Sequence, residues 1–76
     1  MISKVFSARL RQLRKANNLT LEQVGQAIGM RKSSLSDIEN CKQPISFDAA
    51  IRLADFFDVS IDFLLGRTDN PKSHKS

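Results

Sequence analysis

The chain has 76 residues, enough for one domain, because domains usually contain roughly 100–200 residues. Its 41% hydrophobic and 26% charged content is typical of a globular protein, and no apolar run approaches the length of a membrane span or forms a signal peptide. One cysteine and one histidine, His74, exclude an internal disulfide and a cysteine- or histidine-based metal or catalytic cluster. We therefore expect a cytoplasmic protein with no catalytic residues, no metal and no cofactor.

The net charge of +4 is unevenly distributed along the chain. Residues 1–43 carry eight basic and three acidic side chains, a net charge of +5, whereas residues 44–66 have a net charge of −3. A basic half favours a polyanionic partner, since neutralised phosphates release counterions. Composition alone leaves a second interpretation open, in which these charges are ordinary solvated helix faces.

Apolar spacing and capping residues predict helices from the start of the chain. A first helix is expected from about residue 4 to residue 17, because its apolar residues recur at helical spacing. Thr20 and Gln23 form a capping box that opens a second helix, and Gly29 is suited to end it in a left-handed conformation. The residues expected to face the core in these two helices are Phe6, Leu10, Leu13, Val24 and Ile28.

Three further helices and a polar tail complete the predicted chain. The third helix follows Gly29 and stops near Asn40. Ser46 caps a fourth helix, whose inward residues are Ala50, Leu53, Ala54 and Phe57. Ser60 caps a short fifth helix over residues 61–65, closed by Gly66. Residues 67–76 contain no apolar side chain, so we expect a domain over residues 1–66 and a disordered tail over residues 67–76.

The stretch from residue 21 to residue 40 fits a helix-turn-helix. Such a unit needs a small residue where the second helix crosses the first, and Gly25 supplies it. It also needs a turn residue that tolerates a positive φ, which Gly29 provides. Apolar residues would join both helices to the domain: Val24, Ile28, Met30, Leu35 and Ile38. The short polar residues left pointing outward from the second of these helices are Lys32, Ser33, Ser36 and Asp37.

These residues carry a family resemblance. The chain resembles the Cro/C1-type (XRE) helix-turn-helix family over about residues 6–66, in several blocks: residues 13–20 (LRKANNLT), 24–29 (VGQAIG), 34–40 (SLSDIEN), Pro44, 53–60 (LADFFDVS) and 63–66 (FLLG). The resemblance implies an all-α, five-helix lambda-repressor-like DNA-binding domain, with its helix-turn-helix at helices 2 and 3. It further implies that helix 3 docks in the DNA major groove and that a homodimer binds a two-fold symmetric operator.

Residue roles follow from the motif positions. The resemblance implies base reading by Lys32, Ser33, Ser36 and Asp37, whose side chains offer donors and acceptors suited to base edges. It implies phosphate contacts from Asn40 and Lys42, and we expect Gln43 beside them to contribute as well. We also expect Arg31 to meet a phosphate, because it places a positive charge at the positive end of the helix dipole. The structural residues that it implies are Gly25, Gly29 and a buried pair of Arg14 with Glu39. We expect the dimer surface away from the basic half, near the fifth helix, at Val59, Ile61, Phe63 and Leu64.

Three positions depart from the family pattern. Leu21 replaces the glutamine that often contacts phosphate at the start of helix 2. Cys41 replaces a glycine after helix 3, which costs about 1 kcal/mol if Cys41 must be left-handed. Arg31 stands where helix 3 usually has a serine or threonine cap, and it offers no acceptor for a backbone N–H group.

The main functional hypothesis is therefore a sequence-specific transcriptional regulator, a repressor, that binds double-stranded DNA as a homodimer, with no membrane or small-molecule partner. The alternative is a protein-interaction module such as the antitoxin of a toxin–antitoxin pair. The tail lacks the apolar anchors that such a partner-binding segment needs. An enzyme lacks support because no nucleophile–base pair is present, and the acidic residues of the fourth and fifth helices have no metal-binding loop spacing.

Overall fold

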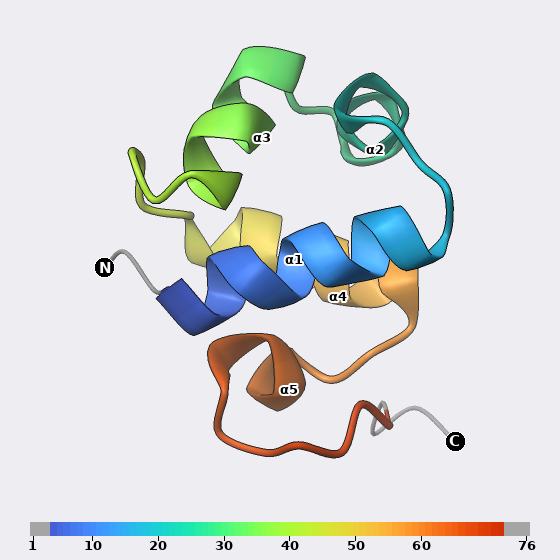
Figure 1. Cartoon of the computed structure of the whole chain (residues 1–76), viewed down its shortest axis with the longest axis vertical. Coiled ribbons are helices and arrows are strands. Elements are labelled where there is room, and N and C mark those ends of the chain that lie inside the picture. Colours follow the sequence, from blue (N-terminus) through green and yellow to red (C-terminus); the bar gives the residue numbers. More distant parts are fainter. Residues whose placement is uncertain (1–3, 73–76) are drawn as a thin grey trace.

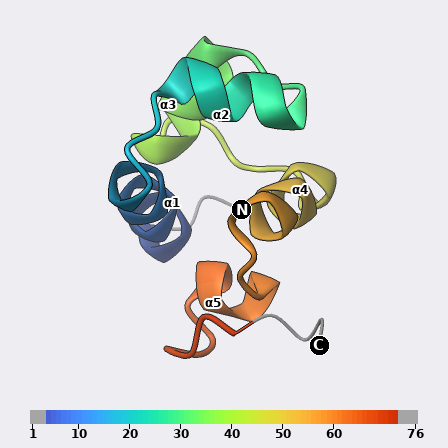
Figure 2. The same ribbon diagram turned by 90° about the vertical axis from the view of Figure 1, so that its right-hand side faces the viewer.

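The computed structural model describes residues 4–72, which form five helices and no strand. In chain order these are α1 (Lys4–Ala16), α2 (Leu21–Ile28), α3 (Lys32–Glu39), α4 (Phe47–Phe57) and α5 (Ile61–Leu65). Helices α1 and α4 lie at the middle level of the molecule, α2 and α3 cover one end, and α5 covers the other (Figures 1 and 2). The predicted all-α, five-helix fold is confirmed. None of the five described helices is long and apolar enough to cross a membrane.

Local signals place the helix ends where the sequence predicts them. The capping box of α2 is complete: the Thr20 hydroxyl accepts a bond from the Gln23 backbone N–H at 3.1 Å, and the Gln23 side chain accepts one from the Thr20 N–H at 2.8 Å. The hydroxyls of Ser46 and Ser60 cap α4 and α5 in the same way. Helices α2 and α5 end at left-handed glycines, Gly29 and Gly66.

The hydrophobic core draws on all five helices. Burying one large apolar side chain stabilises the folded state by roughly 1.5–3 kcal/mol, so the core cluster supplies most of the favourable free energy of folding. Leu13 and Phe57, predicted to face inward, are partly buried and pack against it. The buried residues of this cluster are Phe6, Leu10, Val24, Ile28, Leu35, Ile38, Ala50, Leu53, Ala54, Val59 and Leu64.

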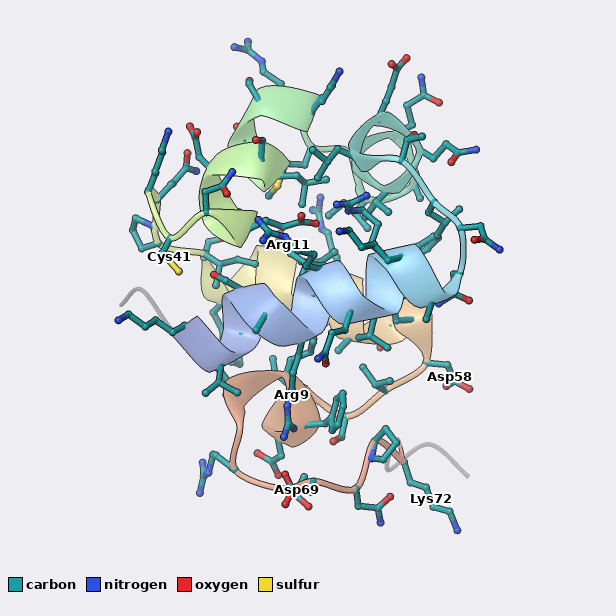
Figure 3. The ribbon with its side chains drawn as sticks, viewed as in Figure 1. Arg9, Arg11, Cys41, Asp58, Asp69 and Lys72 are labelled. Atoms are coloured by element: carbon teal, nitrogen blue, oxygen red, sulfur yellow. The ribbon has the colours of Figure 1, made fainter. Side chains whose placement is uncertain are left out.

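The segment after α5 makes contacts that the sequence analysis did not anticipate. The Arg9 guanidinium on α1 donates to the Thr68 carbonyl at 2.7 Å and pairs with the Asp69 carboxylate at 2.8 Å, as Figure 3 shows for Arg9 and Asp69. The same guanidinium lies 4.1 Å from the ring centroid of Phe63. The domain boundary at residue 66 and the disorder of the tail stay predictions, and residues 73–76, including His74, lie outside the described residues.

Candidate nucleic-acid interface

The joint between α2 and α3 depends on two glycines. A Cβ atom added to Gly25 would lie 2.4 Å from the Met30 carbonyl oxygen, so only glycine fits without a backbone shift. Gly29 has a φ of 73°, in the left-handed region that favours glycine. The Met30 N–H closes the turn by donating to the Gly25 carbonyl at 2.8 Å. The turn therefore fixes how α3 is held against α2.

Helix α3 has one buried face and one face directed to solvent. Leu35 and Ile38 are buried in the core, which fixes the rotation of the helix. Side chains on its other face point away from the rest of the molecule, at the end opposite α5 (Figure 3). The structure brings the four predicted base-reading residues together on this outward side, with Lys32 and Ser33 exposed and Ser36 and Asp37 partly exposed.

The C-terminal end of α3 is fully bonded to the rest of the domain. The last four carbonyl groups of a helix have no partner within the helix. In α3 these belong to residues 36–39, and each accepts a hydrogen bond from outside the helix. Two of the donors, Ser7 and Arg11, come from α1. The donors to the four carbonyls, in order, are Asn40, Lys42, Ser7 and Arg11.

The N-terminal end of α3 is open. Arg31 occupies the N-cap position with extended backbone, and its side chain makes no capping bond. Within the described part of the chain, the backbone N–H groups of residues 31–34 have no hydrogen-bond partner. Free N–H groups and the helix dipole make such an end favourable for an anion. Helix α3 is thus anchored at its C-terminal end and exposes donors at the other.

Exposed cations surround this helix. Arg31, Lys32 and Lys42 form no ion pair within residues 4–72, whereas the arginines of α1 and α4 are all paired with acidic residues. Among the other predicted phosphate contacts, Asn40 is exposed and Gln43 is partly exposed. The predicted phosphate residues therefore lie at both ends of α3, flanking the predicted base-reading residues.

Arg14 on α1, which is partly buried, pairs with the buried Glu39 on α3. Arg14 donates from Nε to one carboxylate oxygen at 2.7 Å and from Nη2 to the other at 3.0 Å, and the Glu39 side chain is 3% exposed. Its Nη1 also donates to the Leu19 carbonyl at 3.0 Å, which ties the loop before α2 to the same guanidinium. The hydrogen bond to Glu39 raises the pKa of Arg14 above its ordinary value, against the opposing effect of burial.

The structure also shows how the three residues that depart from the family pattern are accommodated. Cys41 has a φ of 59°, so a non-glycine residue does occupy the left-handed position after α3. Leu21 packs against the core, and Arg31 leaves the helix uncapped. The sequence analysis did not predict that Arg11 contacts Glu39 and Asn40. The available signal was its spacing, because Arg11 precedes Arg14 by three residues and so shares a helix face with it. No group of three or more acidic, histidine or cysteine side chains suited to a metal occurs within residues 4–72.

The residues expected at a dimer surface separate into two classes. Val59 and Leu64 are buried in the core of the single chain, whereas Ile61 and Phe63 are partly exposed. Ile61 lines an apolar groove of about 180 Å³ that runs between the starts of α1 and α4 and helix α5. The other residues lining the groove are Phe6, Ile45, Ser46, Phe47, Ala50 and Leu65.

Comparison with known proteins finds the same unit elsewhere. Residues 10–64 match a family described as helix-turn-helix. The chain is 45% identical over 67 residues to the uncharacterized HTH-type transcriptional regulator YobD of Bacillus subtilis (strain 168), covering 88% of this chain and 60% of that protein. It is 39% identical over 59 residues to the HTH-type transcriptional regulator AnsR of the same strain, covering 78% of this chain and 51% of that protein. The chain thus spans between half and two thirds of the length of these relatives.

A solved structure shares both the fold and part of the sequence. The N-terminal DNA-binding domain of SinR from Bacillus subtilis superposes with a TM-score of 0.76 at 30% sequence identity, covering 82% of this chain and 91% of that domain. The similarity therefore extends over most of the five-helix unit.

Proposed function

This chain belongs to the Cro/C1-type (XRE) helix-turn-helix family, and on that premise we propose that it binds double-stranded DNA of a specific sequence and regulates transcription. The binding element is α3, which enters the major groove with its N-terminal end toward the bases. The regulators and the DNA-binding domain that the chain resembles support this proposal.

The observation that carries the proposal is the asymmetry of α3. Its C-terminal carbonyls are all bonded, while the N–H groups of residues 31–34 are without partners in the described chain. The exposed cations Arg31 and Lys32 stand at this open end, where they oppose the helix dipole at a cost of ~0.3–1 kcal/mol each. A bound DNA strand removes this penalty because its phosphates and guanine acceptors supply negative charge.

The base-reading residues divide by chemistry. Lys32 can donate to guanine O6 and N7, and Asp37 can accept from cytosine N4. Ser33 and Ser36 can serve as donor or acceptor. Lys42, just beyond the helix, is a point charge suited to phosphate, so it contributes affinity without sequence preference.

We further propose that the chain acts as a homodimer on a two-fold symmetric operator, and that it represses by occupying the DNA. One recognition helix reads few base pairs, whereas two helices spaced about 34–36 Å apart read two half-sites. The apolar groove next to Ile61 supports a dimer surface on the flank of the molecule, where the loop from α3 descends to α4 (Figure 1). Two copies joined along this flank can present both α3 helices to one side of a duplex.

The proposal is tested by selecting bound sites from a random pool of DNA duplexes. We expect an enriched sequence with two-fold symmetry. The dissociation constant for that sequence should rise by several decades between 50 and 200 mM salt if ~6–10 phosphates are contacted. Lys42→Ala should weaken binding to the selected site and to random DNA about equally, whereas Ser33→Ala should reduce the difference between them.

Two results would contradict the proposal. The first is the absence of any enriched sequence after repeated selection with the folded chain. The second is an affinity for DNA that does not change with salt, since phosphate contacts require a salt dependence.

A further inference from the structure

Arg11 carries a positive charge that is not needed to neutralise the carboxylate of Glu39. Two arginines face the single carboxylate of Glu39, and Arg14 already uses both of its oxygens, at 2.7 and 3.0 Å. Arg11 reaches only one of them, from Nε at 3.4 Å. Its side chain is 43% exposed, against 15% for Arg14. The group of three side chains therefore has a net charge of +1, and the surplus lies on the exposed arginine.

The shortest side-chain contact of Arg11 is with Asn40, the residue that follows the last residue of α3. Arg11 Nη2 donates to Asn40 Oδ1 at 2.9 Å, and Asn40 Nδ2 donates to the Ser36 carbonyl at 2.8 Å. A guanidinium only donates and a carbonyl only accepts, so these two bonds fix which way the Asn40 amide faces. Figure 3 shows Arg11 rising from α1 toward α3.

Arg11 keeps donors without a partner in the described chain, and Asn40 keeps one donor whose bond is long. Arg11 Nη1 has no hydrogen-bond partner within residues 4–72. The second N–H of Asn40 Nδ2 makes only a long contact of 3.4 Å to the Ser36 hydroxyl. The free N–H groups of Arg11 Nη1 and the long-bonded N–H of Asn40 thus belong to two neighbouring side chains that are hydrogen-bonded to each other, one of them charged.

We propose that Arg11 and Asn40 bind one DNA backbone phosphate together, with Arg11 also holding the Asn40 amide in the orientation that this contact requires. This inference rests on the proposed function and extends it, because it adds a residue of α1 to the interface and couples it to α3. A phosphate diester suits the pair because its two free oxygens can accept from a guanidinium and an amide at once. The contact fixes the position of the C-terminal end of α3 on the duplex.

Three variants test the pair on the DNA selected by the full chain: Arg11→Met, Asn40→Ala and the double variant. We expect Arg11→Met to weaken binding at least tenfold, as loss of a charge-assisted hydrogen bond does. The slope of log affinity against log salt should become shallower by about 0.9, the value for one phosphate. Asn40→Ala should weaken binding several-fold. The double variant should bind within about twofold of Arg11→Met, because both changes remove the same contact.

Arg67→Met is the matched control. It removes one exposed positive charge two residues after α5, the helix at the opposite end of the molecule from α3 (Figure 1). It should change neither the affinity by more than about twofold nor the salt slope. Thermal melts followed by circular dichroism establish that each variant is folded. If Arg11→Met fails to fold, Arg11→Lys replaces it in the cycle and should bind more weakly than the unmodified chain with its salt slope retained, because an ammonium keeps the charge without the planar fork.

The outcomes separate this inference from the proposed function. Failure of the unmodified chain to bind any DNA would overturn the proposed function itself. Binding by the unmodified chain together with unchanged affinity and salt slope in Arg11→Met would overturn only the role of Arg11. Losses that multiply fully in the double variant would show that Arg11 and Asn40 act on different phosphates and would also overturn the inference.

Discussion

At the scale of single residues, the pair of Arg14 and Glu39 is the contact whose loss should cost the most stability. Removing one partner of a buried pair leaves the other charge uncompensated, at a cost of ~3–5 kcal/mol. The second arginine makes the two losses unequal. After Arg14→Met, Arg11 still stands 3.4 Å from the carboxylate, whereas after Glu39→Leu two arginines face each other without a counter-charge. We expect Glu39→Leu to be the more destabilising change in urea unfolding.

The double variant Arg14→Met with Glu39→Leu should be less destabilised than Glu39→Leu alone, because no charge of the pair remains buried. The exposed pair of Arg52 with Asp48 provides the comparison, and a cycle there should give a coupling of only ~0.3–0.5 kcal/mol. Losses at Arg14 and Glu39 that simply add would contradict this account.

At the scale of helices, the sequence predicted the elements because their ends carry local signals. A capping box at Thr20, serine caps before α4 and α5, and glycines after α2 and α5 act over three or four residues, so they can be read without a structure. The end of α4 differs, since the residue there is Asp58 and not a glycine. Asp58 takes a left-handed conformation with a φ of 55°, which its residue type does not predict. The outward face of α3 was also predictable, because Leu35 and Ile38 fix its rotation.

The missing cap of α3 gives the prediction at this scale. Arg31→Ser should stabilise the free domain by about 1 kcal/mol, since a serine hydroxyl accepts a backbone N–H and the change removes a positive charge from the positive end of the helix. A gain of that size raises the melting temperature of a small domain by ~4–8 °C. If Arg31 meets a phosphate, the same variant should bind operator more weakly.

Melting and operator binding should therefore move in opposite directions in Arg31→Ser. Arg67→Ser removes an exposed arginine just after α5, the helix at the opposite end of the molecule from α3 (Figure 1), and neither quantity should change appreciably. An Arg31→Ser variant that is more stable and binds operator as tightly as before would show that Arg31 has no role in DNA binding.

At the scale of the whole molecule, sequence patterns do not predict the tertiary contacts, because these contacts join segments that are far apart in the chain. Arg9 reaches residues 54 to 60 positions further along the chain, and Arg11 meets α3 across 28 or 29 positions. Neither partner follows from local spacing, since both depend on the angle at which α1 crosses its neighbours. Helix α5 shows the same limit: it has five residues and is apolar on most sides, so its sequence could not separate the buried Leu64 from the partly exposed Ile61.

The proposed dimer surface is tested most sharply at Phe47, which lines the apolar groove and is 74% exposed in the single chain. Phe47→Glu should leave the fold intact, because Phe47 is the first residue of α4 and an acidic residue there interacts favourably with the helix dipole. In a dimer built on this groove, the new carboxylate would be buried against apolar side chains without a partner, which is strongly unfavourable. Analytical ultracentrifugation should then show monomers, and affinity for a full operator should fall toward that for a single half-site.

Phe56→Glu is the matched control: nine residues further along α4, Phe56 lies on the opposite side of the helix and is also exposed, so dimer formation should persist. Dimers of Phe47→Glu that bind the full operator normally would place the symmetric contact elsewhere on the molecule.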